Sequence, residues 1–218
     1  MLIAKYKPRT FNEILGNPNC VAYAQSCVRL RDIPNSLFYG PPGIGKTLTA
    51  DIMVETLYGE DAKGYCYRSY NAADLSKKDV TEQLEKFGQY SLEAFAEREE
   101  GLKMNFPFPP FKTVIVDECE KISSPVETLL RTKIQDSYDW LRFILICNDI
   151  NHPAITGPIL SRLTILQFLP LTSQEMRQGL SNIVQKEGIN ITPQQFNQII
   201  WKHSGDLRGA IMELQLYV

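Results

Sequence analysis

The sequence lacks the cysteine and histidine spacings that hold a structural zinc ion. None of its five cysteines forms a Cys-x-x-Cys pair, and its two histidines, His152 and His203, stand alone. These spacings argue against a zinc site. An odd number of cysteines also fits a reducing compartment better than a disulfide framework. The cysteines are Cys20, Cys27, Cys66, Cys119 and Cys147.

Long apolar runs, internal repeats and an excess of one charge are also missing. No run of about 18 apolar residues and no signal peptide is visible, so we expect a soluble intracellular protein of the nucleus, cytoplasm or nucleoid, without a membrane partner. The net charge of -2 argues against a chain coated in basic residues, so any nucleic-acid contact must come from a local patch or from several copies. With 218 residues, 44% of them apolar, the chain can bury a core without disulfides.

The chain does contain a phosphate-binding loop. Residues 40–47 read Gly-Pro-Pro-Gly-Ile-Gly-Lys-Thr and fit G-x-x-x-x-G-K-[ST] at every position. The apolar run 36–39 predicts a strand before the loop, and the helical spacing over 47–57 predicts a helix after it. A surface turn that matches by chance would not explain this placement. Lys46 is expected to neutralise the outer phosphates of a nucleotide, and Thr47 to offer its hydroxyl to Mg²⁺. The expected nucleotide contacts are Gly40, Pro41, Pro42, Gly43, Ile44, Gly45, Lys46, Thr47 and Leu48.

A second chemical centre lies at the end of a β-branched run, 113–118. This strand ends in Asp117 and Glu118, and packing alone rarely places adjacent carboxylates there. We expect Asp117 to share the Mg²⁺ with Thr47, and Glu118 to orient or deprotonate the attacking water. The alternative is a solvated junction between strand and loop.

Three further apolar runs, at 66–70, 142–149 and 165–168, complete five strands that alternate with helices. This order predicts a doubly wound parallel α/β sheet. Asn148 ends one strand and is placed to reach the γ-phosphate or the water, although polar residues are common there. Lys77 and Lys78 begin a helix near Ser76, where an anionic partner would help, but they also suit plain solvent exposure.

Three segments differ from this pattern: the two ends of the chain and residues 87–110. Residues 1–15 show no clean period and predict an arm, and residues 87–110 predict a helix that gives way to an exposed loop. Beyond Leu171 only helices are expected, opened by Thr172 or Ser173, by Thr192-Pro193 and by Asp206. The predicted domains are therefore an α/β nucleotide-binding domain at 1–171 and a helical lid at 172–218. Asn17 or Asn19 is expected to cap the helix after the arm, and Arg208 to swing onto the phosphates.

Several motifs in this order resemble the AAA+ ATPases, and within them the small subunits of clamp loaders such as replication factor C. They span nearly the whole chain. The matching stretches are Ile3-Ala4-Lys5-Tyr6-Lys7-Pro8, Ile33-Pro34-Asn35, Asn71 to Asp74, Arg142 to Asn148, Ser161-Arg162 and Gly205-Asp206-Leu207-Arg208.

The resemblance implies a P-loop AAA+ fold, a five-stranded parallel sheet with helices on both faces followed by a small helical lid. It implies ATP and Mg²⁺ as ligands, Ile3 and Lys7 as nucleotide contacts, Asn148 and Arg208 as sensors, and Arg162 as an arginine finger serving a neighbour. It also implies a ring or arc that loads a sliding clamp on primer-template DNA, with a large subunit and small-subunit copies as partners. The candidate DNA contacts are Lys77, Lys78 and Arg131.

Departures from the family pattern leave alternatives open. Leu163 replaces a usual cysteine, Cys119-Glu120 replaces Ala-Asp, and the sequence stops at Val218, so we expect the family's collar domain to be absent. One alternative is another AAA+ DNA-remodelling ATPase of the helicase-loader or branch-migration type. The other is a structural ring subunit that binds ATP without hydrolysing it.

Overall fold

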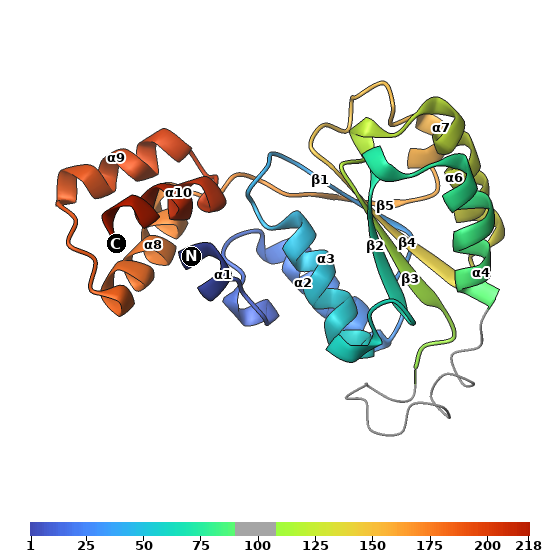
Figure 1. Ribbon diagram of the computed structural model, residues 1–218, viewed down its shortest axis with the longest axis horizontal. Helices are drawn as coiled ribbons and strands as arrows, with labels where there is room; N and C mark the ends of the chain where they lie inside the picture. The colour runs from blue at the N-terminus through green and yellow to red at the C-terminus, as the bar shows by residue number, and fades with distance from the viewer. Residues whose placement is uncertain (90–107) are drawn as a thin grey trace.

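The computed structural model describes residues 1–89 and 108–218 (Figure 1). Its centre is a five-stranded parallel sheet in the order β2-β3-β4-β1-β5. This confirms the predicted fold class, with strand ends displaced from the predicted ones by no more than one or two residues. The strands are β1 (Ser36–Tyr39), β2 (Tyr67–Asn71), β3 (Lys112–Asp117), β4 (Leu141–Cys147) and β5 (Thr164–Gln167).

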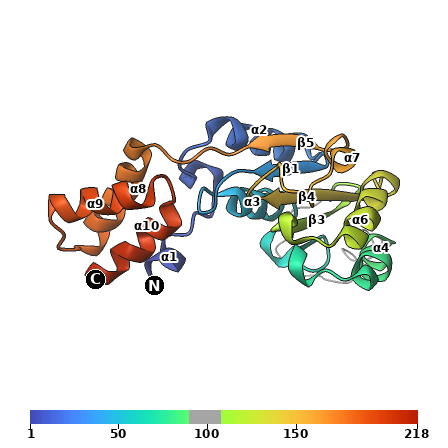
Figure 2. The same ribbon diagram turned by 90° about the horizontal axis from the view of Figure 1, so that it is seen from above.

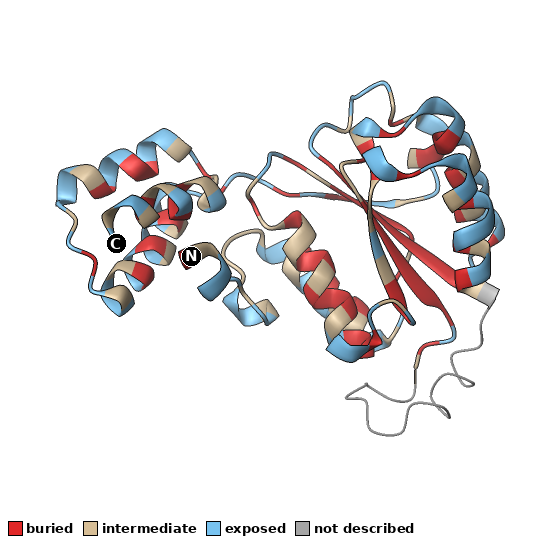
Figure 3. Ribbon diagram, viewed as in Figure 1, coloured by how far each residue is buried: buried red, intermediate tan, exposed pale blue. Residues whose placement is uncertain are grey.

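Helices cover both faces of the sheet, so most central-strand residues are buried on either side (Figure 3). Alternate residues of β4 enter different cores: Ile144 packs toward α2 and α3, whereas Phe143 and Leu145 pack toward α4, α6 and α7. The first face carries α2 (Pro18–Leu30) and α3 (Lys46–Tyr58), and the second carries α4 (Leu84–Gln89), α6 (Ser124–Asp136) and α7 (Gly157–Leu160).

Short helical turns connect these elements. Helical structure begins at Lys77, close to the prediction, and passes through a π-helical stretch before α4. The predicted loop within 87–110 lies mostly outside the described residues. None of the described helices has the length and apolar character needed to cross a membrane. The short elements are η1 (Phe11–Glu13), η2 (Glu60–Ala62), η3 (Ala72–Asp74), η4 (Asp79–Gln83), η5 (Cys119–Lys121) and η6 (Gln215–Tyr217).

Asn35 fastens the start of β1 to three other parts of the α/β unit. Its side-chain amide donates to the Ile134 carbonyl at the end of α6 (3.1 Å), and its Oδ1 accepts from the Phe143 amide (2.8 Å). Its own carbonyl accepts from the Thr164 amide (2.8 Å). The residue is only 4% exposed, so water does not compete for these groups.

Replacing Asn35 with alanine should lower the free energy of unfolding by about 2–4 kcal/mol, because two buried backbone groups would lose their partners. Urea denaturation followed by circular dichroism measures the change. Asn190→Ala, at an exposed position in the lid, is the matched control and should stay within about 0.5 kcal/mol of the wild type. Equal losses in both variants would contradict the assigned role of Asn35.

The predicted arm at the N-terminus is wrong for its first residues, which fold as α1 (Leu2–Lys5) against the lid. Leu2 is buried in the lid core, and its amide donates to Gln215 Oε1 (2.6 Å). Lys5 Nζ lies 2.6 Å from Glu187 Oε1. Tertiary packing therefore orders a segment too short to show a helical period.

The lid consists of α8 (Ser173–Glu187), α9 (Pro193–His203) and α10 (Leu207–Leu214), beside the sheet unit (Figure 2). The predicted helix starts are confirmed. Thr172 and Thr192 each accept from the backbone amide of the third helical residue in a capping box, and Asp206 accepts from the Gly209 amide (3.0 Å). Of the two possible caps at the first helix, Thr172 rather than Ser173 takes the position.

Two chain segments join the sheet unit to the lid, and Asn17 ties them together. Its Nδ2 donates to the Leu169 carbonyl (3.0 Å), and its Oδ1 accepts from the Leu169 amide (2.7 Å). Asn17, one of the two predicted candidates, takes the N-cap position of α2 with φ of 51°, but its side chain makes no capping bond. The Asn17 side chain bonds the Leu169 backbone, just after β5, instead of the first amides of α2.

Candidate nucleotide-binding site

The phosphate-binding loop connects β1 to α3, as predicted, and at two of its glycines a positive φ is combined with a close approach of other atoms. Gly40 and Gly43 have φ of +144° and +77°. A Cβ on Gly40 would lie 2.1 Å from the Phe168 carbonyl oxygen, and one on Gly43 would lie 1.7 Å from Asp206 Oδ1 of the lid segment. The loop is therefore packed closely between β5 and the start of α10.

The other loop residues have distinct surroundings. Pro41 and Pro42 are exposed, whereas Ile44 is buried in the core beneath the loop. Gly45 is the N-cap of α3, and Leu48 lies half-buried in its first turn. The first amides of a helix have no partner within the helix, and together with the helix dipole they suit an anionic group.

Lys46 is buried and folded back onto the loop. Its Nζ donates to the carbonyls of Gly40 and Pro41 (both 2.6 Å) and to Asn148 Oδ1 (3.0 Å). Burial lowers the pKa of Lys46, Asp117 partly opposes this, and the positive charge of Arg208 lowers the pKa further. An ammonium held by neutral acceptors keeps its charge available for a phosphate, which would be a stronger partner.

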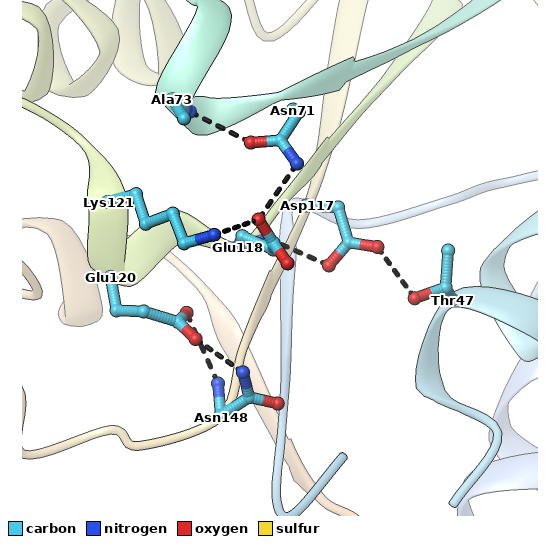
Figure 4. Close-up of polar contacts among 8 residues, drawn as sticks. All are labelled: Thr47, Asn71, Ala73, Asp117, Glu118, Glu120, Lys121 and Asn148. Carbon is cyan, nitrogen blue, oxygen red and sulfur yellow. Dashed lines mark hydrogen bonds and ion pairs between the residues drawn. The ribbon is translucent and has the colours of Figure 1, made fainter. Parts of the chain in front are cut away.

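Thr47 and Asp117 meet where α3 begins and β3 ends (Figure 4). Thr47 Oγ1 donates to Asp117 Oδ2 (2.7 Å), and Asp117 Oδ1 accepts from the Glu118 amide (2.8 Å). The described residues hold no cluster of three or more acidic, histidine or cysteine side chains suited to a metal. Two adjacent oxygens nevertheless fit Mg²⁺, which commonly takes one or two protein ligands and fills its shell with water and phosphate oxygens.

Glu118 adopts a left-handed backbone with φ of 56°, and two donors hold its carboxylate (Figure 4). Its Oε2 accepts from Lys121 Nζ (2.7 Å) and from Asn71 Nδ2 (2.8 Å), and Asn71 Oδ1 accepts from the Ala73 amide (2.9 Å). Lys121 and then Asn71 hold the pKa of Glu118 below its ordinary value. The carboxylate is thus kept ionised, as a base requires, but one oxygen is occupied.

Asn148 links the loop to an acid that the sequence pattern did not identify as a site residue. Its Nδ2 donates to Glu120 Oε1 (2.5 Å) and its backbone amide to Glu120 Oε2 (3.3 Å), while its Oδ1 faces Lys46. Glu120 therefore orients the Asn148 amide. The signal available in the sequence was a third acid, three residues after Asp117, in the strand-end run.

The remaining predicted nucleotide contacts differ in how they relate to this centre. Arg208 is exposed at the start of α10, close enough for its charge to act on Lys46. Lys7 Nζ lies 3.4 Å from Asp51 Oδ2 on α3, and Ile3 packs at the border of the lid core. Arg208 therefore acts on the loop lysine, whereas Lys7 contacts α3 and Ile3 packs with the lid.

Four of the predicted residues lie apart from the loop. Arg162 is exposed between α7 and β5, and all the partners that the described structure gives its side chain are in α6 and α7 or the residue after α7. Lys77 and Lys78 are exposed at the start of the helical segment before α4, and Arg131 is half-buried on α6. The structure therefore assembles one centre and leaves the other cations on separate surfaces.

Comparison with known proteins identifies the family. Residues 36–171 match the AAA model, described as the ATPase family associated with various cellular activities. Human replication factor C subunit 4 is 33% identical over 98% of this chain and 57% of the relative, and the Archaeoglobus fulgidus replication factor C small subunit is 32% identical over 98% and 62%. The chain thus spans about three fifths of these relatives' length.

Among solved structures, the Thermotoga maritima RuvB Holliday junction branch migration motor superposes with a TM-score of 0.66 at 20% identity, covering 96% of this chain and 64% of that one. At this identity the likeness concerns the fold alone. The family match extends from β1 through the phosphate-binding loop to the residue before the lid. This chain belongs to the AAA family of ATPases.

Proposed function

We propose that the chain binds Mg·ATP and hydrolyses it as a subunit of a sliding-clamp loader of the replication factor C type. The observation that carries this proposal is the convergence of Lys46, Thr47, Asp117, Glu118 and Asn148 at one edge of the sheet. The relatives named replication factor C support the choice of assembly, because their similarity extends over nearly the whole chain.

Each residue has a distinct role in this proposal. Lys46 turns from the loop carbonyls onto the outer phosphates, and Thr47 with Asp117 holds the Mg²⁺, which when bound offsets the phosphate charge. Glu118 accepts a proton from the attacking water after its carboxylate leaves Lys121 and Asn71. Asn148, oriented by Glu120, donates to the γ-phosphate or the water.

The lid completes the site. We propose a division near residue 171, with α1 packed against the lid, so that Ile3, Lys7 and Arg208 approach the nucleotide together. Asp206 already lies against Gly43, which brings the start of α10 to the loop. Differential contact of Arg208 with ATP and with product would couple the lid position to hydrolysis.

Arg162 is proposed to serve the nucleotide of a neighbouring subunit. Arg162→Ala should bind ATP as tightly as the wild type, because Arg162 lies apart from its own loop, but it should lower turnover in assemblies by about 10³-fold or more. Fluorescent nucleotide titration measures the first quantity and phosphate release the second. Unchanged turnover in mixed assemblies would remove the role in trans.

Clamp and DNA partners follow from the same proposal. The partners would be a large subunit, further small-subunit copies, a sliding clamp and primer-template DNA. Lys77, Lys78 and Arg131 are the proposed phosphate contacts, and binding through them would be independent of base sequence and weakened by salt.

Two other functions remain to be separated by experiment. A branch-migration or helicase-loading ATPase would use the same centre on different DNA, and a scaffold subunit would bind ATP without turnover. Phosphate release measured with primer-template DNA, with junction DNA and without DNA distinguishes the three. Stimulation by primer-template DNA and clamp together supports the clamp-loader function, and turnover stimulated only by junction DNA contradicts it.

A further inference from the structure

We propose that Gln135 is a positioning residue that presents Arg162 to the neighbouring subunit's nucleotide. This inference rests on the proposed function of Arg162 in trans and adds the residue that orients it. Gln135 lies in the last turn of α6, 27 positions before Arg162, and it belongs to none of the motifs found in the sequence.

The guanidinium of Arg162 is held on two sides. Its Nε and Nη2 both donate to Gln135 Oε1, at 3.0 and 2.8 Å. Its Nη1 donates to the Pro158 carbonyl within α7 and to Ser161 Oγ (3.2 Å). Ordering an exposed arginine side chain on association costs rotamer entropy. Because these bonds already order Arg162 in the single chain, less entropy is lost when the neighbouring subunit binds.

A neutral acceptor suits this task better than a carboxylate would. Glutamate at position 135 could accept the same two bonds, but it would offset the positive charge that must act on a developing phosphate charge. The glutamine amide orients the guanidinium and leaves its charge uncompensated. The second Nη2 hydrogen is also left for an external acceptor, because a guanidinium has five donors.

Gln135 on α6 and Arg162 just after α7 are held at a fixed separation because the two helices are bonded to each other. Thr156, the N-cap of α7, donates its hydroxyl to Glu127 Oε1 on α6 (2.6 Å), and Glu127 is only 6% exposed. Ile134, next to Gln135, is buried, and its carbonyl accepts from Asn35. Buried contacts therefore fix both backbones, and Gln135 is the partner from α6 that orients the Nε and Nη2 side of the exposed guanidinium.

A complementation experiment with full-length chains tests the inference. Copies carrying Arg162→Ala can hydrolyse ATP only with a finger from a neighbour, and copies carrying Glu118→Gln can supply the finger but not hydrolyse. Mixing the two should restore phosphate release. Adding Gln135→Ala to the Glu118→Gln donor should lower the restored kcat about three- to tenfold without changing KM for ATP. Gln198→Ala, at an exposed position on α9, is the matched control in the same donor.

A second readout separates positioning from a general structural effect. In NMR spectra of the single chain, Gln135→Ala should speed solvent exchange of the Arg162 Nε proton, whereas Gln135→Glu should keep it slow and still lower complementation. A Gln135→Ala donor that complements fully overturns this inference and leaves the finger role intact. Failure of the Arg162→Ala and Glu118→Gln mixture to exceed either variant alone overturns the role of Arg162 in trans, and this inference with it.

Discussion

Lys46→Ala is expected to weaken ATP binding by about 100-fold or more. The ammonium makes three hydrogen bonds within the loop, and in the complex it would exchange them for charge-assisted bonds to phosphate oxygens, each worth about 1.5–3 kcal/mol. Alanine can supply neither the charge nor the donors. Isothermal titration with ATP and Mg²⁺ measures the loss directly.

The same substitution leaves the Gly40 and Pro41 carbonyls without their partner, so folding must be measured alongside binding. Lys46→Met retains the length of the side chain and should weaken binding to a similar extent while preserving the circular dichroism spectrum. Lys63→Ala, an exposed lysine beyond α3, serves as the control and should bind like the wild type. A folded Lys46 variant that binds ATP within about threefold of the wild type would contradict the assignment of the loop.

Glu118→Gln is expected to retain nucleotide affinity and to lower turnover by about 10²–10⁴-fold, the usual range for loss of a general base. The glutamine oxygen can still accept from Lys121 and Asn71, so the local structure should persist. What is lost is the capacity to take a proton from water. Single-turnover phosphate release, compared with binding of a fluorescent nucleotide, separates the two effects.

Glu82→Gln provides the matched control, because Glu82 is an exposed carboxylate in the helical stretch before α4. It should change neither binding nor turnover. If Glu118→Gln hydrolyses ATP at the wild-type rate, Glu118 is not the base. If it fails to bind ATP, the residue has a structural role in the loop that its contacts with Lys121 and Asn71 do not explain.

Local sequence signals account for most of the fold. β-branched runs such as 113–116 predict buried strands whatever follows them, and Thr172, Thr192 and Asp206 open helices through bonds to residues three positions away. α1 escaped prediction because four residues cannot show a period and Leu2 is ordered by the lid core. The interaction of Asn17 with Leu169 joins positions 152 apart, which no local rule reaches.

The candidate site is likewise predictable from the sequence only in part. The loop and the strand-end acids follow from contiguous patterns, and their proximity follows from the shared carboxyl edge of parallel strands. The contacts that hold the Glu118 carboxylate are less evident from the sequence: Asn71 reaches it only because β2 ends beside β3, in register with Asp117, and Lys121 turns back through η5. The hold of Gln135 on Arg162 also requires the packing of α6 beside α7.

The paired connection between sheet unit and lid has a mechanical consequence. One segment runs from α1 through Phe11, which packs on the sheet-side core, to Asn17 at the start of α2. The other runs from Phe168 in that core to Leu171 in the lid core, and the Asn17 side chain bonds the Leu169 backbone within it. A body attached by a single tether can swivel about three axes. Attachment at two adjacent points removes some of this freedom, so we expect any movement of the lid relative to the sheet unit to follow mainly one axis.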